Sequence, residues 1–92
     1  MAGLVYKRAR DLMEADIGEE LVALDPQQGN CFGFNDVAAW VWRRLERPAT
    51  FDQLRDELVG AYDVSEEQCA AELKELLDTM CREKLLTSGN SD

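Results

Sequence analysis

Residues 21–42, LVALDPQQGNCFGFNDVAAWVW, contain the two changes of pattern that decide the fold. A compact apolar run ends at Asp25, and the next five residues supply the proline, glycine and asparagine that are typical of a hairpin connection. In the run that follows, Phe32 and Phe34 share one face, which predicts a returning strand. At Asn35 the apolar spacing becomes helical, so a helix is expected to begin there.

The pattern extends in both directions from this segment. Residues 12–17 precede it and predict a further strand, while Asp36 to Arg44 follow it as the first helix. Thr50 and Ser65 each begin a capping box, and these boxes predict the starts of a second and a third helix. The predicted fold class is therefore α+β, with a three-stranded antiparallel sheet followed by three α-helices. This order resembles a winged helix-turn-helix whose sheet is placed first.

Composition excludes several functions. The chain has 92 residues, 19 acidic and 10 basic side chains, a formal net charge of -9 and no histidine. Its length fits one domain with a small core. The acidic balance argues against binding to nucleic acid or to anionic membranes, because both depend on lysine and arginine. Without histidine the chain lacks the commonest general acid/base and neutral metal ligand, so we expect no enzyme activity, no metal and no cofactor.

The three cysteines are predicted to be reduced thiols. Cys31, Cys69 and Cys81 are an odd number without metal-ligand spacing. Cys69 and Cys81 lie on the predicted third helix and would be ~18 Å apart at ~1.5 Å per residue, which is beyond disulfide reach. Reduced thiols, with no signal-peptide pattern or apolar span in the sequence, indicate a cytoplasmic location.

Charge divides the chain into three expected parts, a basic N-terminal arm at 1–10, a domain at 11–87 and a C-terminal tail at 88–92. The arm holds Lys7 and Arg10, and all of its charged side chains are basic. Such an arm is either a solvated terminus or a segment that folds back on the acidic body or contacts a partner.

The returning strand is expected to be an open sheet edge. It consists of Cys31, Phe32, Gly33 and Phe34, and it has no lysine or proline to discourage pairing. Because Gly33 lets a second backbone approach closely, the strand is suited to pair with an added peptide strand. The alternative is an ordinary core strand covered by a neighbour. An unpaired edge also allows weak self-association.

Two helix faces can be interpreted either as core or as binding surface. The third helix has an apolar shoulder beside its core stripe, formed by Ala70, Lys74, Leu77 and Cys81. This shoulder either lines a groove beside the open strand or widens the core stripe. The opposite shoulder is more polar and holds Glu72, Thr79 and Glu83. On the first helix, Trp40 lies opposite the apolar stripe and is either half-packed or an anchor for a partner.

The apolar anchors follow the pattern of a known family over roughly residues 11–86. They are Leu21-Val22-Ala23-Leu24-Asp25, a glycine turn, Phe34-Asn35, Ala38, Val41-Trp42, Leu45, Thr50, Leu54, Leu58, Tyr62-Asp63-Val64, Leu76-Leu77 and Lys84-Leu85-Leu86. In these positions the chain resembles the PqqD-like family, and in particular its stand-alone recognition elements, including those of lasso-peptide clusters. Two positions depart from the family pattern, since Phe34 replaces a leucine and Glu46-Arg47-Pro48 replaces a glycine.

The resemblance implies a non-catalytic domain that binds the leader segment of a ribosomally synthesised precursor peptide in natural-product (RiPP) biosynthesis. The leader would be added as a strand against the third strand, in a groove walled by the third helix, and delivered to a modifying enzyme or leader peptidase. By position, the resemblance assigns peptide binding to Cys31, Phe32, Gly33, Phe34, Ala70, Lys74, Leu77 and Cys81.

Two rival hypotheses come from other functional classes. One is a winged-helix DNA-binding regulator, but its recognition helix would carry only three basic side chains, Lys74, Arg82 and Lys84, and six acidic ones. The other is a structural subunit that docks on a larger enzyme through Trp40 and the acidic surface.

Overall fold

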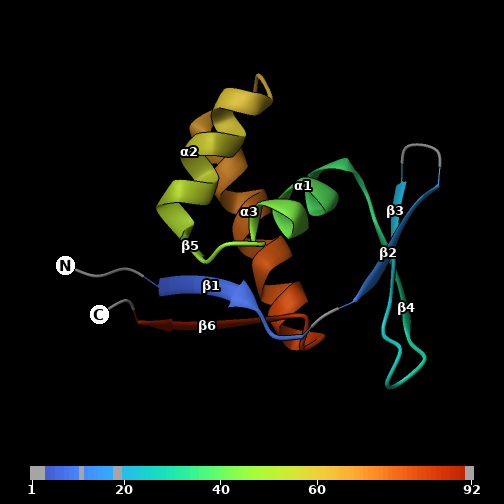
Figure 1. Cartoon of the computed structure of the whole chain (residues 1–92). Coiled ribbons are helices and arrows are strands. Elements are labelled where there is room, and N and C mark those ends of the chain that lie inside the picture. The colour runs from blue at the N-terminus through green and yellow to red at the C-terminus, as the bar shows by residue number, and fades with distance from the viewer. Residues whose placement is uncertain (1–3, 11, 18–19, 91–92) are drawn as a thin grey trace.

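The computed structural model describes residues 4–10, 12–17 and 20–90. Its elements, in chain order, are β1 (Leu4–Arg8), β2 (Met13–Ile17), β3 (Glu20–Leu24), β4 (Cys31–Phe34), α1 (Asp36–Arg44), β5 (Ala49–Thr50), α2 (Phe51–Ala61), α3 (Glu66–Arg82) and β6 (Leu86–Asn90) (Figure 1). The outermost residues of the expected arm and tail, 1–3 and 91–92, lie outside the described residues.

The predicted three-stranded antiparallel sheet is present, and its strand order is β2-β3-β4. Leu21 lies opposite Phe34, and Ala23 lies opposite Phe32, so these four side chains share the face that packs on the helices. The turn between β3 and β4 needs a left-handed residue, and Gly29 supplies it with φ 74°. The α+β class is therefore confirmed, whereas the likeness to a winged helix-turn-helix stays a prediction.

The helices begin where their caps predict. Asn35 Oδ1 accepts the N–H of Ala38 at 2.9 Å at the start of α1. Thr50 and Gln53 form both bonds of a capping box at the start of α2. Ser65 Oγ accepts the N–H of Gln68 at 3.2 Å at the start of α3. Local hydrogen bonding thus fixes all three helix starts.

A second three-stranded sheet, of order β5-β1-β6, was not predicted. Here β1 pairs antiparallel with β6 over its whole length, from Leu4 opposite Asn90 to Arg8 opposite Leu86. The segments expected as a basic arm and a tail are therefore joined as strands. Within the expected arm, the described residues Leu4–Arg8 pair with β5 and β6. A pairing between residues so far apart in the chain leaves no local signal in the sequence.

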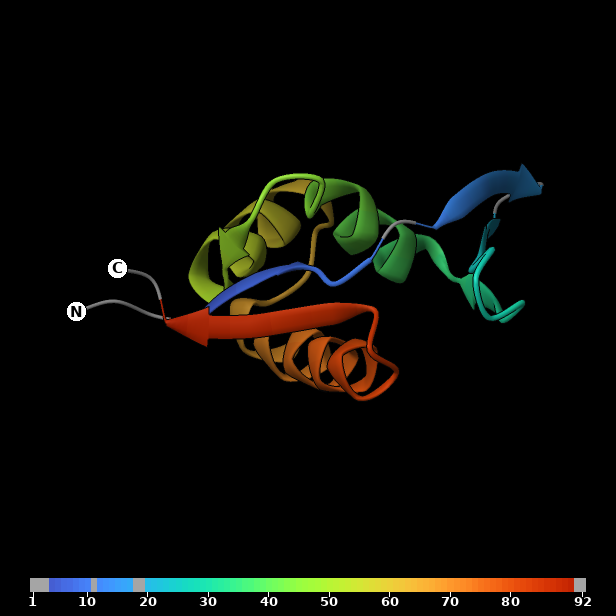
Figure 2. The same cartoon turned by 60° about the horizontal axis from the view of Figure 1, so that its bottom comes forward.

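The core lies between the two sheets and the helices, and Trp42 at its centre is fully buried. Figure 2 shows β1 and β6 side by side, with α3 on one side of them and α1 and α2 on the other. Contacts of α3 with β6 and of α2 with β1 agree with this arrangement. The second sheet consequently covers one side of α3, which limits where α3 can meet anything else.

Strand β2 has its polar side chains directed toward the helices and its apolar ones directed outward. Glu14 Oε2 accepts the indole N–H of Trp42 at 3.1 Å, and Asp16 pairs with Arg43. Met13 and Ile17, on the other face, are 62% and 63% exposed. The outer face of this sheet is therefore largely apolar and open.

Candidate functional site

The outer edge of β4 is open among the described residues, because β4 pairs only with β3. Asp25 N–H donates to the Asn30 carbonyl at 2.8 Å, which makes these two residues a hydrogen-bonded pair. Bonded and non-bonded pairs alternate along an antiparallel ladder, so Phe32 bonds to β3 while Cys31 and Gly33 do not. The N–H and C=O groups of Cys31 and Gly33 therefore face the open edge.

A groove of about 540 Å³ lies between this edge and α3. Its lining residues come from β4, the loop after β4, the two helices α1 and α3, and the turn that follows α3. They are Cys31, Phe32, Gly33, Phe34, Asn35, Ala38, Leu76, Thr79, Met80, Glu83 and Leu85. The floor of the groove is apolar and consists of the buried residues Phe34, Ala38, Met80 and Leu85. At its sides lie Phe32 and Leu76, which are half-buried. The site thus combines free backbone hydrogen-bonding groups with an apolar floor.

One stripe of α3 forms the helical wall of the groove. Its members follow the spacing i, i+3, i+4 and i+7, which places them on one side of a helix. They are Leu76, Thr79, Met80 and Glu83. Periodicity alone could have found this stripe. The sequence places Thr79 and Glu83 on the polar shoulder of the helix, so the position of this stripe at the groove was not predicted.

The structure brings Cys31, Phe32, Gly33 and Phe34 together along the groove, and their binding of a peptide stays a prediction. The four helix residues expected with them, Ala70, Lys74, Leu77 and Cys81, do not line it. Leu77 is fully buried in the core. The second sheet, which was not predicted, lies on the Cys81 side of α3, and peptide binding by these four residues stays a prediction.

The surroundings of Cys81 show which side of α3 the second sheet covers. Burial, and to a smaller extent the charge of Asp78, raise the pKa of the Cys81 thiol. The pKa of Tyr6 on β1 is also raised, first by burial and then by the neighbouring Cys81 and Asp78. Cys81 therefore lies close to Tyr6 on β1, and it is not among the residues that line the groove.

An ion pair fastens the β3–β4 hairpin to the end of α3. Asp25 is only 2% exposed, accepts the N–H groups of Gln27 and Gln28 through Oδ1, and pairs with Arg10 through Oδ2. Arg10 also donates to the Glu83 carbonyl at 3.1 Å, at the C-terminal end of α3. The two walls of the groove are thereby tied together at one end. This role of Arg10 was not predicted, although an aspartate before a turn is a recognisable signal.

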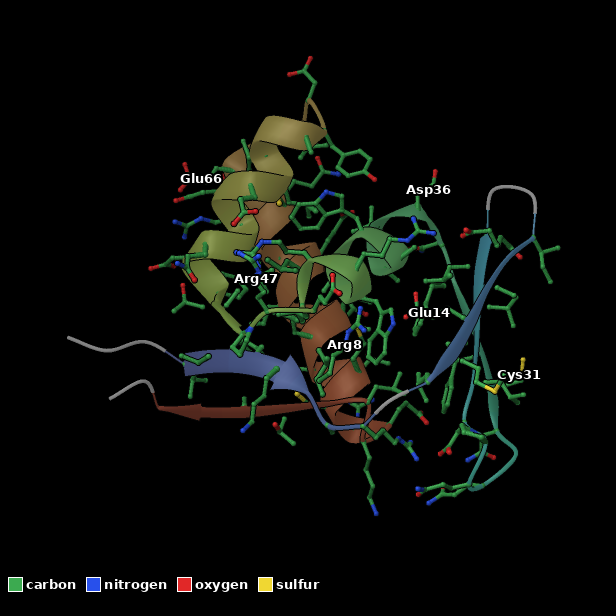
Figure 3. All side chains as sticks on the ribbon, in the orientation of Figure 1. Arg8, Glu14, Cys31, Asp36, Arg47 and Glu66 are labelled. Carbon is green, nitrogen blue, oxygen red and sulfur yellow. The ribbon has the colours of Figure 1, made fainter. Side chains whose placement is uncertain are left out.

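A second ion-pair cluster holds β2 against α1. Arg8 donates to the carbonyl of Trp42, lies 4.2 Å from the centre of its ring, and approaches Glu14 at 3.6 Å. Figure 3 shows Arg8 and Glu14 in the space between β1, β2 and α1. This cluster positions the sheet that carries the groove.

Trp40 is half-buried against the core, which agrees with the half-packed alternative. It lines a separate cavity of about 510 Å³ between α1 and α2, together with Arg43, Arg44, Glu57 and Tyr62. Arg44 and Glu57 pair with each other across this cavity at 2.7 Å. One wall of this cavity is therefore formed by an ion pair within the chain.

The described residues contain no group of three or more cysteine, aspartate or glutamate side chains placed to hold a metal ion. The three cysteines in them are free thiols. Among the described helices, none is both long and apolar enough to cross a membrane.

Comparison with known proteins places this architecture in a family. The family described as coenzyme PQQ synthesis protein D (PqqD) matches residues 20–86, which span β3 to the start of β6 and include both walls of the groove. The chain belongs to the PqqD family. No curated protein matches the chain significantly.

A solved structure described as TbiB1 in complex with the TbiA(beta) leader peptide is similar to this PqqD-family chain. The two are 27% identical, with a TM-score of 0.76, and the match covers 94% of this chain and 99% of the TbiB1 chain. The likeness therefore extends beyond the residues that match the family, into the part of this chain that contains β1 and β2.

Proposed function

We propose that the chain binds the leader segment of a ribosomally synthesised precursor peptide, without catalysis, by strand addition to β4. The observation that carries this proposal is the open edge of β4 beside a groove with an apolar floor. A solved relative with nearly complete coverage is in complex with a leader peptide, which supports the same class of ligand here.

The groove suits an extended peptide. Cys31 and Gly33 offer about four backbone donors and acceptors to an added strand. A strand of four residues spans ~13 Å at ~3.3 Å per residue, so a leader segment of similar length is enough to cover β4. Alternate side chains of that segment would point to the floor made by Phe34, Met80 and Leu85, and we expect them to be apolar.

Delivery is the second part of the proposal. A leader held on β4 leaves the rest of the precursor outside the groove, where a modifying enzyme or leader peptidase of a natural-product (RiPP) pathway can act on it. We propose that this step takes place in the cytoplasm, where free cysteines persist as thiols. The chain itself supplies affinity and position, and the partner enzyme supplies the reaction.

The test is a titration with the leader peptide encoded beside the gene of this protein, with a scrambled leader as the control. Binding at or below tens of micromolar is expected for the native leader only. Amide shift changes should concentrate on Cys31–Phe34 and on Leu76, Thr79 and Glu83. Absence of binding at that concentration, or shifts confined to β2 or to the Trp40 cavity, would overturn the proposal.

A further inference from the structure

A polar cavity continues the groove at the hairpin end of β4. It has a volume of about 410 Å³, and Cys31, Phe32 and Glu83 line both this cavity and the groove. Its other lining residues are the cations Arg10, Arg82 and Lys84 and the amides Gln28 and Asn30. A peptide strand paired with β4 would therefore run directly into a group of hydrogen-bond donors.

The positive charge of this cavity contrasts with the rest of the chain. Only 10 of the 92 residues are basic, and three of them line this cavity. Arg10 is committed to the buried carboxylate of Asp25. Arg82 and Lys84 take part in none of the ion pairs among the described residues. Glu83 is the one acidic side chain among the lining residues, so cations outnumber anions at the cavity.

The backbone of Lys84 provides an independent observation. Lys84 has φ 63°, in the left-handed region that favours glycine. It follows α3 at the position where helices commonly end in glycine, since Leu85 N–H donates to the Met80 carbonyl and Lys84 N–H to the Cys81 carbonyl. A lysine here is less favourable for the fold than glycine would be. Non-glycine residues in such conformations cluster at functional sites.

We infer that this cavity binds the carboxylate of an aspartate or glutamate in the leader peptide, just beyond the segment that pairs with β4. This inference rests on the proposed function and names a specificity determinant of the same site. The Arg82 guanidinium can hold a carboxylate through two parallel N–H bonds, and the Lys84 ammonium adds a second cation. The amides of Gln28 and Asn30 supply neutral donors beside them.

The experiment measures the affinity of the encoded leader and of copies in which each aspartate or glutamate is replaced in turn by asparagine or glutamine. One of these replacements should weaken binding about tenfold, and the others should have little effect. In Arg82→Gln and Lys84→Gly proteins the native leader should bind about 3- to 10-fold more weakly. The sensitive peptide replacement should then cost much less than it does with the unmodified protein.

Lys84→Gly separates binding from folding. Because glycine is favoured at this backbone position, its unfolding midpoint should equal or exceed that of the unmodified protein while its affinity for the leader falls. Arg47→Gln is the matched control, since it removes the same charge from an exposed side chain that does not line the groove or its polar extension. The affinity of the Arg47→Gln protein for the leader should stay within about twofold of that of the unmodified protein.

Three results would overturn this inference while the proposed function stands. They are equal binding of all the carboxamide peptides, native affinity in both the Arg82→Gln and Lys84→Gly proteins, and tight binding of a leader that contains no aspartate or glutamate. Failure of the native leader to bind at all would instead overturn the proposed function itself, and the inference with it.

Discussion

The indole N–H of Trp42 donates to the carboxylate of Glu14 at 3.1 Å, and this bond joins the buried centre of α1 to strand β2. Trp42 is fully buried, so its N–H has no access to water. The bond explains why β2 directs its carboxylates toward the helices, because a buried donor needs a partner. It also makes Glu14 part of the support for the sheet that ends in β4.

Replacing Glu14 with alanine should therefore destabilise the protein by about 1–3 kcal/mol, because the Trp42 N–H is left unsatisfied. Glu14→Gln keeps an oxygen acceptor and should cost less. Urea unfolding followed by tryptophan fluorescence measures both changes. Glu20→Ala, which alters an exposed residue of the same sheet, should stay within about 0.5 kcal/mol of the unmodified protein. Equal effects at positions 14 and 20 would contradict the role given to Glu14.

Leu76 and Leu77 are neighbours in sequence with opposite expected roles. Leu77 is fully buried, so Leu77→Ala should lower the free energy of unfolding by about 2–5 kcal/mol. Leu76 is half-buried at the groove, so Leu76→Glu should retain a folded protein and weaken leader binding. Circular dichroism on heating and the leader titration measure the two effects. The placement of the groove would be wrong if Leu76→Glu bound the leader as tightly as the unmodified protein.

Gly33 offers a test of strand addition that separates backbone from side chain. Gly33→Pro removes an N–H that faces the open edge and is not part of the β3–β4 ladder, so leader affinity should fall about tenfold or more. Gly33→Ala keeps this N–H, and a Cβ at Gly33 has no heavy atom within 4 Å. The alanine protein should therefore fold normally and, because it keeps the N–H, lose much less affinity than the proline protein. Equal affinities for the proline and alanine proteins, both folded by circular dichroism, would count against pairing at this edge.

Alkaline pH should destabilise the protein. Burial raises the pKa of Cys69 and of Cys81 above the ordinary value of 9.0, and burial raises that of Tyr6 above 10.0. The unfolded chain therefore releases these protons first, so their contribution to stability is complete below about pH 9 and is lost as pH rises further. Urea midpoints in reducing buffer between about pH 8 and about pH 10.5 should fall steadily, and Cys81→Ala should reduce the slope. A flat or rising profile would contradict the burial of these groups.

Local signals predicted most of the elements. The hairpin at residues 25–30 and the caps at Asn35, Thr50 and Ser65 depend on neighbours in sequence, and the structure contains all of them. The β5-β1-β6 sheet depends on a pairing between the two ends of the chain, and β6 is a mostly polar strand without a clear alternation. Sequence periodicity therefore could not reveal it.

The sequence placed the strand residues at the groove but not the helix residues that line it, and peptide binding at these positions stays a prediction. An unpaired edge could be inferred from Gly33 and from the short turns of the meander. The periodicity of α3 gives a stripe with two shoulders, but it does not say which shoulder is covered. That choice depends on the β1–β6 pair, which lies on the Cys81 side and leaves Leu76, Thr79 and Glu83 facing β4.

The outward face of β2 has a consequence for the behaviour of the protein in concentrated solution. Met13 and Ile17 leave an exposed apolar surface on this face. It favours association at every pH, because neither side chain titrates. At neutral pH the net charge of -9 keeps separate molecules apart by mutual repulsion. Lowering the pH toward the isoelectric point of about 4.4 reduces this net charge, and high salt screens it. Either change weakens the repulsion without altering the exposed apolar face. We therefore expect association through this face to increase on acidification or at high salt, and light scattering of the Met13→Ser/Ile17→Ser protein should show less of it.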